Sequence, residues 1–301
     1  MASWLLRVFA VIYVVRFAWP ALSAASGASV FGEPWLPDGG ASLLLDSDIR
    51  YWGVTSATIA ALFALGSVNV RRSLVWMDLV FFGVLIGAAI RTWEMAVFGL
   101  PPGPAVVATV FEWVFPLAWF ATTARLRATK RYGIEESIEV AVPKARMWEV
   151  FADFGSVHAW HPYMESASLD DPSHGLGVGA ARTCRFGPKM AIRETVREWD
   201  DAGAMTIAID FLEGFPPPIH DILASVRVEP LGAERSRLVL SMSFRSKLGP
   251  LGGILAEAFV LGQYRAVFGG MLGAAKRWAE TGETSPPIAM PLSGRRLPEV
   301  A

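Results

Sequence analysis

Long apolar stretches fill the first part of the chain and end near Ala124, where polar residues begin to appear at ordinary density. Four of these stretches are long enough to cross a bilayer as helices, because about 20 helical residues span its hydrocarbon core. They cover Trp4–Ala24, Tyr51–Val68, Leu74–Phe98 and Ala105–Ala124. We therefore expect an all-α membrane domain, a four-helix bundle in which each helix satisfies its own backbone hydrogen bonds.

Short runs of alternating apolar and polar residues follow, which is typical of half-buried strands. The first run, Tyr132–Val142, precedes a helix that begins after Pro143, since proline is tolerated in a first helical turn. Six more strands are expected at Met164–Leu169, Ala181–Phe186, Ala191–Trp199, Met205–Phe211, Leu223–Glu229 and Arg237–Arg245. The stretch Leu251–Ala279 has apolar residues at helical spacing. This order predicts an α+β domain with helices on one face of an antiparallel sheet.

The two patterns divide the chain into four parts. They are a membrane domain at 1–125, a basic linker at 126–133, a soluble domain at 134–281 and a disordered tail at 282–301. The mean hydropathy of +0.39 is high for a soluble protein, and the first part causes it. The net charge of −1 gives no bulk attraction to nucleic acid, so no nucleic-acid partner is predicted.

Basic residues set the expected orientation of the membrane domain. Arg71 and Arg72 lie between the second and third apolar stretches, and a further group at 125–131 follows the fourth. The positive-inside rule then predicts a multi-pass protein of the inner (plasma) membrane with both termini and the soluble domain in the cytoplasm. A competing interpretation makes Met1–Ala25 a cleaved signal peptide, but Arg16 would interrupt its apolar core.

Several ionisable residues fall inside or at the edge of the apolar stretches, where charge is costly and needs partners. Those expected in the outer half of the bilayer form a predicted polar cluster of Arg16, Asp48, Arg50, Arg91, Glu94 and Glu112. The cluster is either a site for a small molecule or proton, or an ion-pair network that fixes helix packing. Asp78 is expected near the inner face, where its side chain reaches water.

The entry to the second stretch reads Asp48-Ile49-Arg50-Tyr51-Trp52-Gly53. Together with the spacing of the four stretches, this motif resembles a family of small, uncharacterised four-helix bacterial membrane proteins. The resemblance covers residues 5–125. It implies a topology and no activity.

Other motifs lie in the soluble part. They are Val142-Pro143 followed by Trp148 and Phe151-Ala152-Asp153-Phe154, then Trp160-His161-Pro162, Gly179-Ala180-Ala181-Arg182, Arg193-Glu194 and Pro217-Pro218-Ile219. Over residues 134–280 the chain resembles the START-like (SRPBCC) superfamily in its polyketide cyclase/dehydrase branch. The resemblance implies a helix-grip fold with a cavity between the sheet and the long C-terminal helix. It leaves activity open, because folds of this kind serve many functions.

Cavity-facing positions follow from that resemblance. The candidate ligand-binding residues are Trp160, His161, Tyr163, Arg182, Glu194, Phe211, Phe215 and Phe259. They combine apolar side chains with a few polar ones, as ligand pockets do. Arg182 and Glu194 lie on neighbouring predicted strands, so they either grip a polar ligand group or form an ion pair near the sheet surface.

Catalytic signals are weak. His161 with Glu194 could form an acid/base pair, since histidine titrates near neutral pH. His158 and His161 have a spacing that suits a metal only if a third ligand joins them, and no HExxH motif or cysteine pair is present. No metal and no cofactor is therefore predicted.

Three functions remain open. The leading hypothesis is a membrane-anchored protein, with the lipid bilayer as one partner, that binds a hydrophobic small molecule or lipid in the cytoplasmic domain. An alternative is a cyclase- or hydratase-like enzyme acting on an aromatic or polyketide-like substrate. A third is a structural protein whose membrane helices assemble with protein partners that the sequence does not identify.

Overall fold

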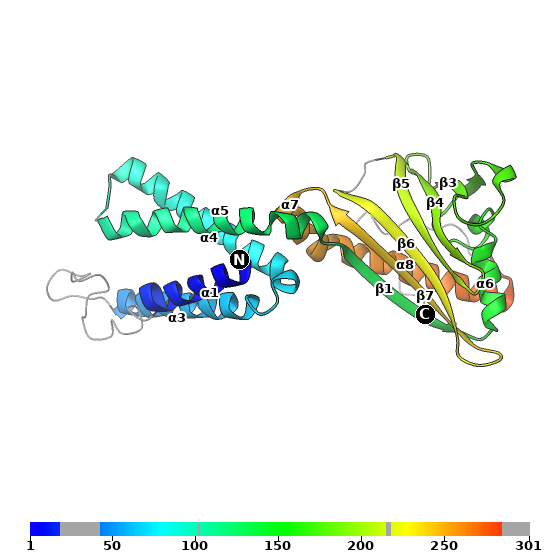
Figure 1. Ribbon diagram of the computed structural model, residues 1–301, viewed down its shortest axis with the longest axis horizontal. Coiled ribbons are helices and arrows are strands. Elements are labelled where there is room, and N and C mark those ends of the chain that lie inside the picture. Colours follow the sequence, from blue (N-terminus) through cyan, green and yellow to red (C-terminus); the bar gives the residue numbers. More distant parts are fainter. Residues whose placement is uncertain (19–42, 102, 215–217, 285–301) are drawn as a thin grey trace. The chain divides into compact units, whose positions relative to one another are not determined.

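The fold was analysed in a computed structural model that describes residues 1–18, 43–101, 103–214 and 218–284 (Figure 1). The chain divides into two compact units. The helical unit contains Met1–Thr129 and Gly249–Ile254, and the sheet unit contains Lys130–Leu248 and the chain from Leu255 onward. The predicted disordered tail falls mostly outside the described residues.

The helical unit is built from long apolar helices. Its described elements are α1 (Ala2–Ile12), the π-helical η1 (Tyr13–Ala18), α3 (Leu43–Gly66), α4 (Val70–Phe98) and α5 (Gly103–Thr129). Asn69 ends the short connection before α4 and caps that helix, because its side chain accepts a hydrogen bond from the Arg72 N–H at 3.1 Å. In this unit α1 packs against α3 and α4 against α5.

Aromatic rings form the centre of the helical unit. The ring of Phe81 lies 5.2 Å from Phe63, 5.3 Å from Trp119 and 5.5 Å from Phe9, measured between centroids. Other large apolar side chains point outward, among them Trp76 and Trp93, which are 66% and 69% exposed. The unit therefore has apolar residues on its surface as well as in its core.

Within the described ranges, two helices are long and apolar enough to cross a membrane: Val70–Phe98 and Val106–Thr129. Shorter apolar helices cover Ala2–Val15 and Gly53–Gly66 among the described residues. The first predicted stretch, Trp4–Ala24, runs beyond the described part of the chain. A bundle of four spanning helices stays a prediction.

The described part of the sheet unit contains one antiparallel sheet of seven strands in the order β1-β7-β6-β5-β4-β3-β2 (Figure 1). The strands are β1 (Tyr132–Val140), β2 (Ser166–Leu169), β3 (Ala181–Arg185), β4 (Ala191–Asp200), β5 (Ala204–Glu213), β6 (Ile219–Pro230) and β7 (Ser236–Ser246). Register shifts interrupt the pairing of β4 with β5 and of β6 with β7. Such bulges increase twist and bend a strand.

Helices cover one face of this sheet. They are α6 (Lys144–Ala152), the short turn η3 (Val157–Ala159) and α8 (Leu261–Thr281), while a second short turn, η4 (Pro172–His174), is exposed between β2 and β3. Before α8 come α7 (Gly249–Leu255) and the π-helical η5 (Ala256–Val260), so the predicted single helix is a series of three segments. The antiparallel sheet with a long C-terminal helix confirms the α+β helix-grip prediction for this half of the chain.

The segment predicted as a linker is mostly regular structure. Helix α5 continues to Thr129 and strand β1 begins at Tyr132, so only Lys130 and Arg131 lie between them. The helix extends because the residues after Ala124 include good helix formers such as Arg125, Leu126 and Arg127.

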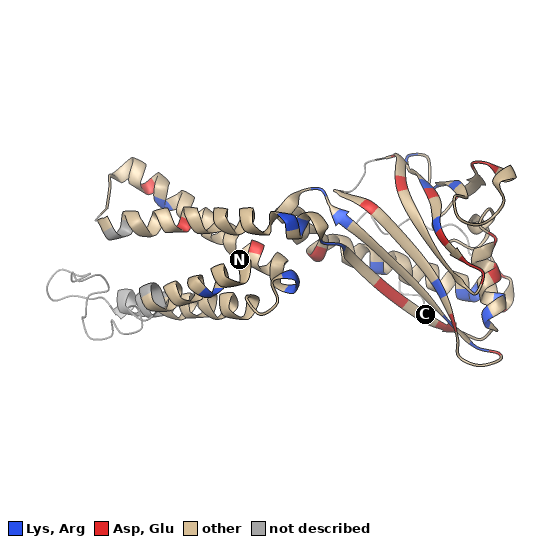
Figure 2. Ribbon diagram, viewed as in Figure 1, with Lys and Arg blue, Asp and Glu red and all other residues tan. Residues whose placement is uncertain are grey.

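Charged residues are sparse in the helical unit and frequent in the sheet unit (Figure 2). Of the predicted polar cluster, Arg91 and Glu112 form an ion pair at 3.1 Å between α4 and α5. Glu94 is exposed, although it shares a helix with Arg91. The side chains of Arg16, Asp48 and Arg50 are not among the side chains that the structure describes.

Asp78 differs from its prediction. Instead of reaching water, its side chain is buried and accepts a hydrogen bond from the Trp119 indole N–H at 2.7 Å. Arg127 donates to both carboxylate oxygens, with Nε at 2.9 Å from Oδ2. The prediction was wrong because α5 runs past Ala124 and carries Arg127 back over Asp78, which a sequence pattern for spans alone does not indicate.

Candidate functional site

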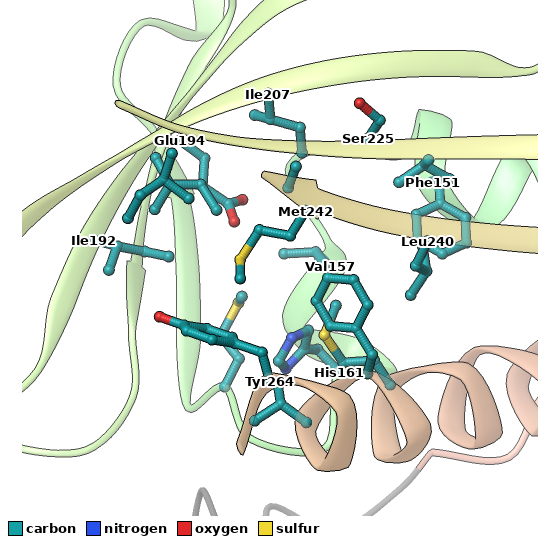
Figure 3. Close-up of a pocket in the computed structure, with 18 of the residues that line it drawn as sticks. Phe151, Val157, His161, Ile192, Glu194, Ile207, Ser225, Leu240, Met242 and Tyr264 are labelled. Atoms are coloured by element: carbon teal, nitrogen blue, oxygen red, sulfur yellow. The ribbon is translucent and has the colours of Figure 1, made fainter. Parts of the chain in front are cut away.

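A cavity of about 120 Å³ lies between the sheet and α8 in the sheet unit. Strands β3 to β7 supply its wall on one side, and Tyr264, Val267, Phe268 and Met271 of α8 close the other. Phe151 of α6 and Val157 of η3 also line it (Figure 3). The cavity is about as large as an engineered cavity of about 150 Å³ that binds benzene, so one small ring fits without rearrangement.

The wall is mostly aliphatic, aromatic and thioether. Its apolar residues include Trp160, Phe186, Ile192, Ile207, Ile209, Phe211, Ile222, Val226 and Leu240. Five methionines also line it: Met164, Met190, Met205, Met242 and Met271. Methionine side chains are unbranched and adaptable, so this wall can adjust to ligands of different shape.

One buried ion pair stands in this apolar wall. Arg182 of β3 and Glu194 of β4 are directly opposite each other in the strand register. Arg182 donates to Glu194 Oε2 from Nε at 2.6 Å, and its second contact from Nη2 measures 2.5 Å. Both side chains are almost completely buried. Each carboxylate or guanidinium removed from water in this way needs its partner.

The remaining nitrogen of Arg182 is also used. Its Nη1 donates to the Phe154 carbonyl oxygen at 2.6 Å, and the guanidinium carbon lies 3.9 Å from the centre of the Phe154 ring. The segment after α6 thus fixes the arginine from the side away from the glutamate. Cation–π contact adds to this positioning.

The two oxygens of Glu194 have different surroundings. Oε2 accepts both contacts from Arg182 and lies 3.7 Å from the Cys184 thiol sulfur. No hydrogen bond from the described residues reaches Oε1, and the carboxylate points into the cavity (Figure 3). Burial and the charge of Glu194 raise the pKa of Cys184 to about 12, so the thiol remains a hydrogen-bond donor.

His161 lies at the cavity edge, buried beside aromatic rings. Its Nδ1 accepts the Tyr163 backbone N–H at 3.3 Å, so we assign the imidazole hydrogen to Nε2. Burial, and secondly the charge of Arg182, lower the pKa of His161 to about 3. The ring is therefore neutral at physiological pH and is a weak proton acceptor.

Two tyrosine hydroxyls also lie in or beside the cavity wall. Tyr264 lines the cavity, and burial raises the pKa of its hydroxyl to about 12. Tyr163 is buried beside the cavity, and burial raises the pKa of its hydroxyl as well. The Tyr163 hydroxyl has no hydrogen-bond partner among the described residues, and neither does the Trp160 indole N–H.

Most of the predicted ligand-binding positions come together here. Trp160, His161, Arg182, Glu194 and Phe211 line the cavity. Phe215 lies outside the described residues, and Tyr163 packs against α8 instead of facing the cavity.

Phe259 was predicted to face the cavity and does not. It is 62% exposed and belongs to the π-helical segment before α8. It precedes Tyr264 by five residues, which is not the spacing of one helix face. Tyr264 was missed, yet it is separated by three and four residues from Leu261 and Phe268, so the apolar pattern contained the signal.

The site offers hydrogen bonding more clearly than catalysis. One carboxylate oxygen and one neutral imidazole face an apolar space, which suits a small ligand with a polar group. No hydrogen bond links His161 with Glu194 in the described part of the chain. A search of the described residues finds no group of three or more His, Cys, Asp or Glu side chains that could hold a metal.

Solved structures with a similar arrangement come from several organisms. The Zhui aromatase/cyclase from Streptomyces sp. R1128 is 21% identical, with 52% of this chain and 99% of that chain covered and a TM-score of 0.40. Norcoclaurine synthase from Thalictrum flavum, bound to dopamine and hydroxybenzaldehyde, is 15% identical over 49% of this chain and 86% of its own, with a TM-score of 0.40.

An uncharacterized protein from Bacillus thuringiensis is 17% identical over 48% of this chain and 97% of its own, with a TM-score of 0.41. No curated protein matches the chain. The resemblance of the first 125 residues to a membrane protein family stays a prediction. Residues 131–277, the C-terminal half of the chain, match the model of the family described as polyketide cyclase/dehydrase and lipid transport.

Proposed function

We propose that this protein binds a small hydrophobic molecule in the cavity of its sheet unit and is anchored to a membrane by its helical unit. The match of residues 131–277 to a family of cyclases, dehydrases and lipid transport proteins supports a hydrophobic ligand. A lipid chain would need the methionine-rich wall to open further than the present 120 Å³.

The observation that carries the proposal is the composition of the cavity. It is an apolar space within a folded core that would otherwise be close-packed, since voids larger than a water molecule are few in protein interiors. A single carboxylate, already neutralised by Arg182, faces that space. An apolar volume with a few placed polar groups is the usual design of a ligand pocket.

Membrane anchoring is supported by the low burial of apolar helices. Only 33% of the residues in the most apolar stretch of α4, and 28% in that of α5, are buried inside the protein. A core helix of a water-soluble protein would bury most of such a stretch. Exposed apolar side chains of this number are stable against lipid and unfavourable against water.

The proposed orientation places both termini and the sheet unit in the cytoplasm. Arg71 and Arg72 lie in the first turn of α4, and Arg125 and Arg127 near the end of α5, so basic residues gather at one side of the predicted spans. Accessibility labelling of single cysteines, placed at Asn69 and at Gly99 in a Cys184→Ser background, tests this. Labelling of Gly99→Cys and not Asn69→Cys in intact cells is expected, and the reverse pattern contradicts the orientation.

Native mass spectrometry tests ligand binding on the full chain, released from detergent after gentle purification. We expect a mass increment from a bound hydrophobic molecule in the wild type. In Ala224→Phe the added ring fills the cavity, because Ala224 lines it opposite Ile207 in the strand pairing. That variant should lose the increment.

A matched control uses the neighbouring strand. Ala208 lies on β5, pairs with Leu223 and is not part of the cavity wall. Side chains alternate between sheet faces, so Ala208→Phe places the same ring on the other face. Retention of the bound molecule in Ala208→Phe is expected. A bound molecule that persists equally in Ala224→Phe would place it elsewhere, for instance among annular lipids, and would contradict the proposal.

A second candidate is a cyclase- or hydratase-like reaction, favoured by the oxygen of Glu194 that faces the cavity without a protein donor. Such an oxygen can accept a proton from a bound substrate. His161 contributes less to this idea, since its low pKa makes it a weak base. Turnover of a poly-β-ketone thioester by the wild type, and its loss in Glu194→Gln, would favour the enzymatic function. Identical turnover rates in the two proteins would contradict it.

A further inference from the structure

The hydrogen bonds around Arg182 limit what a ligand can receive from it. Nε and Nη2 donate to Glu194, and Nη1 donates to the Phe154 carbonyl. One face of the guanidinium is covered by the Phe154 ring. A guanidinium has five N–H groups, and these three contacts leave one on each Nη. An anionic ligand group bound there would still add an uncompensated negative charge to a pair that is already neutral inside an apolar wall.

Glu194 is the group that remains available. Its Oε2 is used by Arg182 and faces the Cys184 thiol, whereas Oε1 accepts nothing from the described residues. A carboxylate oxygen in an apolar cavity is a strong acceptor and accepts only from a ligand that carries an O–H or N–H. The cavity is therefore selective for a hydrogen-bond donor.

Charge balance selects the kind of donor. Arg182 already neutralises Glu194 inside the apolar wall, so a cationic amine would bring an additional uncompensated charge out of water. A neutral hydroxyl avoids that cost. Its oxygen can in turn accept from His161, whose Nδ1 is occupied by the Tyr163 N–H and whose hydrogen is therefore on Nε2.

We propose that the cavity selects a neutral, ring-sized molecule bearing a hydroxyl group, with the hydroxyl donating to Glu194 Oε1, over anionic and cationic molecules of the same size. This inference rests on the proposed function, because it names the ligand class of the same cavity. It assigns Glu194 a role in specificity and Arg182 the role of positioning Glu194.

The test uses the full chain in detergent, labelled at the methionine methyl groups and observed by NMR. Met205 and Met242 line the cavity, whereas Met77 and Met95 belong to the helical unit and report on partition into detergent. The probes are p-cresol, toluene, benzoate and benzylamine, all built on one benzene ring. Each is titrated while all four methyl signals are followed.

We expect p-cresol to shift the Met205 and Met242 signals at concentrations that leave Met77 and Met95 unchanged. Its dissociation constant should be at least about tenfold lower than that of toluene, the size expected for a hydrogen bond to a charged group. Benzoate and benzylamine should bind more weakly than toluene. Tighter binding of benzoate or benzylamine than of p-cresol would overturn the inference.

Other outcomes separate this inference from the proposed function. Equal affinity for p-cresol and toluene would overturn the hydroxyl selectivity and leave the apolar cavity as a binding site. No shift of Met205 or Met242 with any probe would overturn both.

Two variants locate the hydroxyl contact. Glu194→Gln keeps the shape of the side chain, and we expect the preference for p-cresol over toluene to fall at least about fivefold. Cys184→Ala removes the thiol beside Oε2 and leaves Oε1 in place, so its preference should stay within about twofold of the wild type. If Glu194→Gln unfolds, the Cys184→Ala chain still reports the selectivity ratio, and a ratio near one there counts against the inference.

Discussion

Each unit contains a buried arginine–carboxylate pair. The two arginines are held in the same way, but the two carboxylates differ in how their oxygens are occupied. In both, the arginine also donates to the carbonyl of a phenylalanine and lies over its ring: Phe120 for Arg127 and Phe154 for Arg182. In the helical unit, Arg127 and the Trp119 indole occupy both oxygens of Asp78. In the sheet unit, one oxygen of Glu194 faces a cavity.

The difference distinguishes scaffolding from a site. A buried charge is retained at a cost in desolvation, and that cost is offset when every acceptor has a donor. Asp78 meets this condition with protein groups alone. Glu194 meets it only in part, because one of its oxygens has no donor among the described residues. A ligand can therefore donate a hydrogen bond to that oxygen. Both pairs are buried and both are ion pairs, so these properties do not distinguish Asp78 from Glu194. The two carboxylates differ in the number of hydrogen-bond donors that each oxygen has.

The largest expected effect comes from breaking the Arg127–Asp78 pair, in which both carboxylate oxygens have protein donors. Asp78→Asn leaves Arg127 buried without its counter-charge and should lower the stability of the helical unit by about 3–5 kcal/mol. Hydrogen-exchange mass spectrometry over a temperature series, following peptides of α4 and α5, measures it. Glu94→Gln, at an exposed position of the same helix, should leave exchange unchanged. Equal effects of the two substitutions would contradict the role given to Asp78.

Acid should destabilise the sheet unit through His161. Above about pH 6.5 the imidazole is neutral in both folded and unfolded chains. Between about 6.5 and 3 only the unfolded chain takes up the proton, so stability falls as the pH falls. At pH 4.5 the loss amounts to at most about 2–3 kcal/mol, since each pH unit contributes about 1.4 kcal/mol.

The measurement is the thermal midpoint of the sheet unit within the full chain across this pH range. His161→Asn keeps an acceptor for the Tyr163 N–H and should flatten the dependence. His158→Asn changes an exposed histidine of the same segment and should keep the wild-type slope. A wild-type slope in His161→Asn would assign the pH dependence to other groups.

Helix α8 approaches Tyr163 closely at one glycine. A methyl group at Gly270 would lie 1.9 Å from the Tyr163 hydroxyl oxygen, whereas one at Gly269 meets nothing within 4 Å. Gly270→Ala should therefore cost about 1–3 kcal/mol through overpacking. Gly269→Ala should stabilise by up to about 1 kcal/mol, since alanine favours helix. Chemical denaturation of the sheet unit gives both values, and the same sign for both would contradict the packing described.

The smallest effect is expected from an exposed pair in the same sheet. Arg185 and Glu213 lie 3.2 Å apart, and about half of each side chain is exposed. Glu213→Gln should change the free energy of unfolding by less than about 1 kcal/mol, because solvent screens exposed pairs. The same substitution at Glu194 should cost several times more. Similar losses at both positions would mean that burial does not set the strength of the Glu194 pair.

The fold of the sheet unit could be predicted from sequence because its patterns are local. Alternation placed each strand within a few residues of its observed bounds, and Pro143 marked the start of α6. The interruption of the last helix was missed, because the π-helical turn Ala256–Val260 has the same apolar composition as its neighbours. Phe259 lies in that turn and is 62% exposed.

The site was partly predictable for the same reason. Arg182 and Glu194 follow from strand pairing, which a sequence pattern gives. Which oxygen of Glu194 is free does not, because it depends on a thiol and a carbonyl brought in from Cys184 and Phe154. In the helical unit the partner of Asp78 is 49 residues away, and hydropathy carries no information on such pairs.

The most direct test of the account is the affinity of the full chain for p-cresol, measured by calorimetric titration at neutral pH in wild type, Ala224→Phe and Ala208→Phe. Filling the cavity in Ala224→Phe should weaken binding at least about tenfold, because the added ring would occupy the space of one ligand ring. Ala208→Phe should bind like the wild type. Equal affinity in all three proteins would contradict the claim that the cavity of the sheet unit is the binding site.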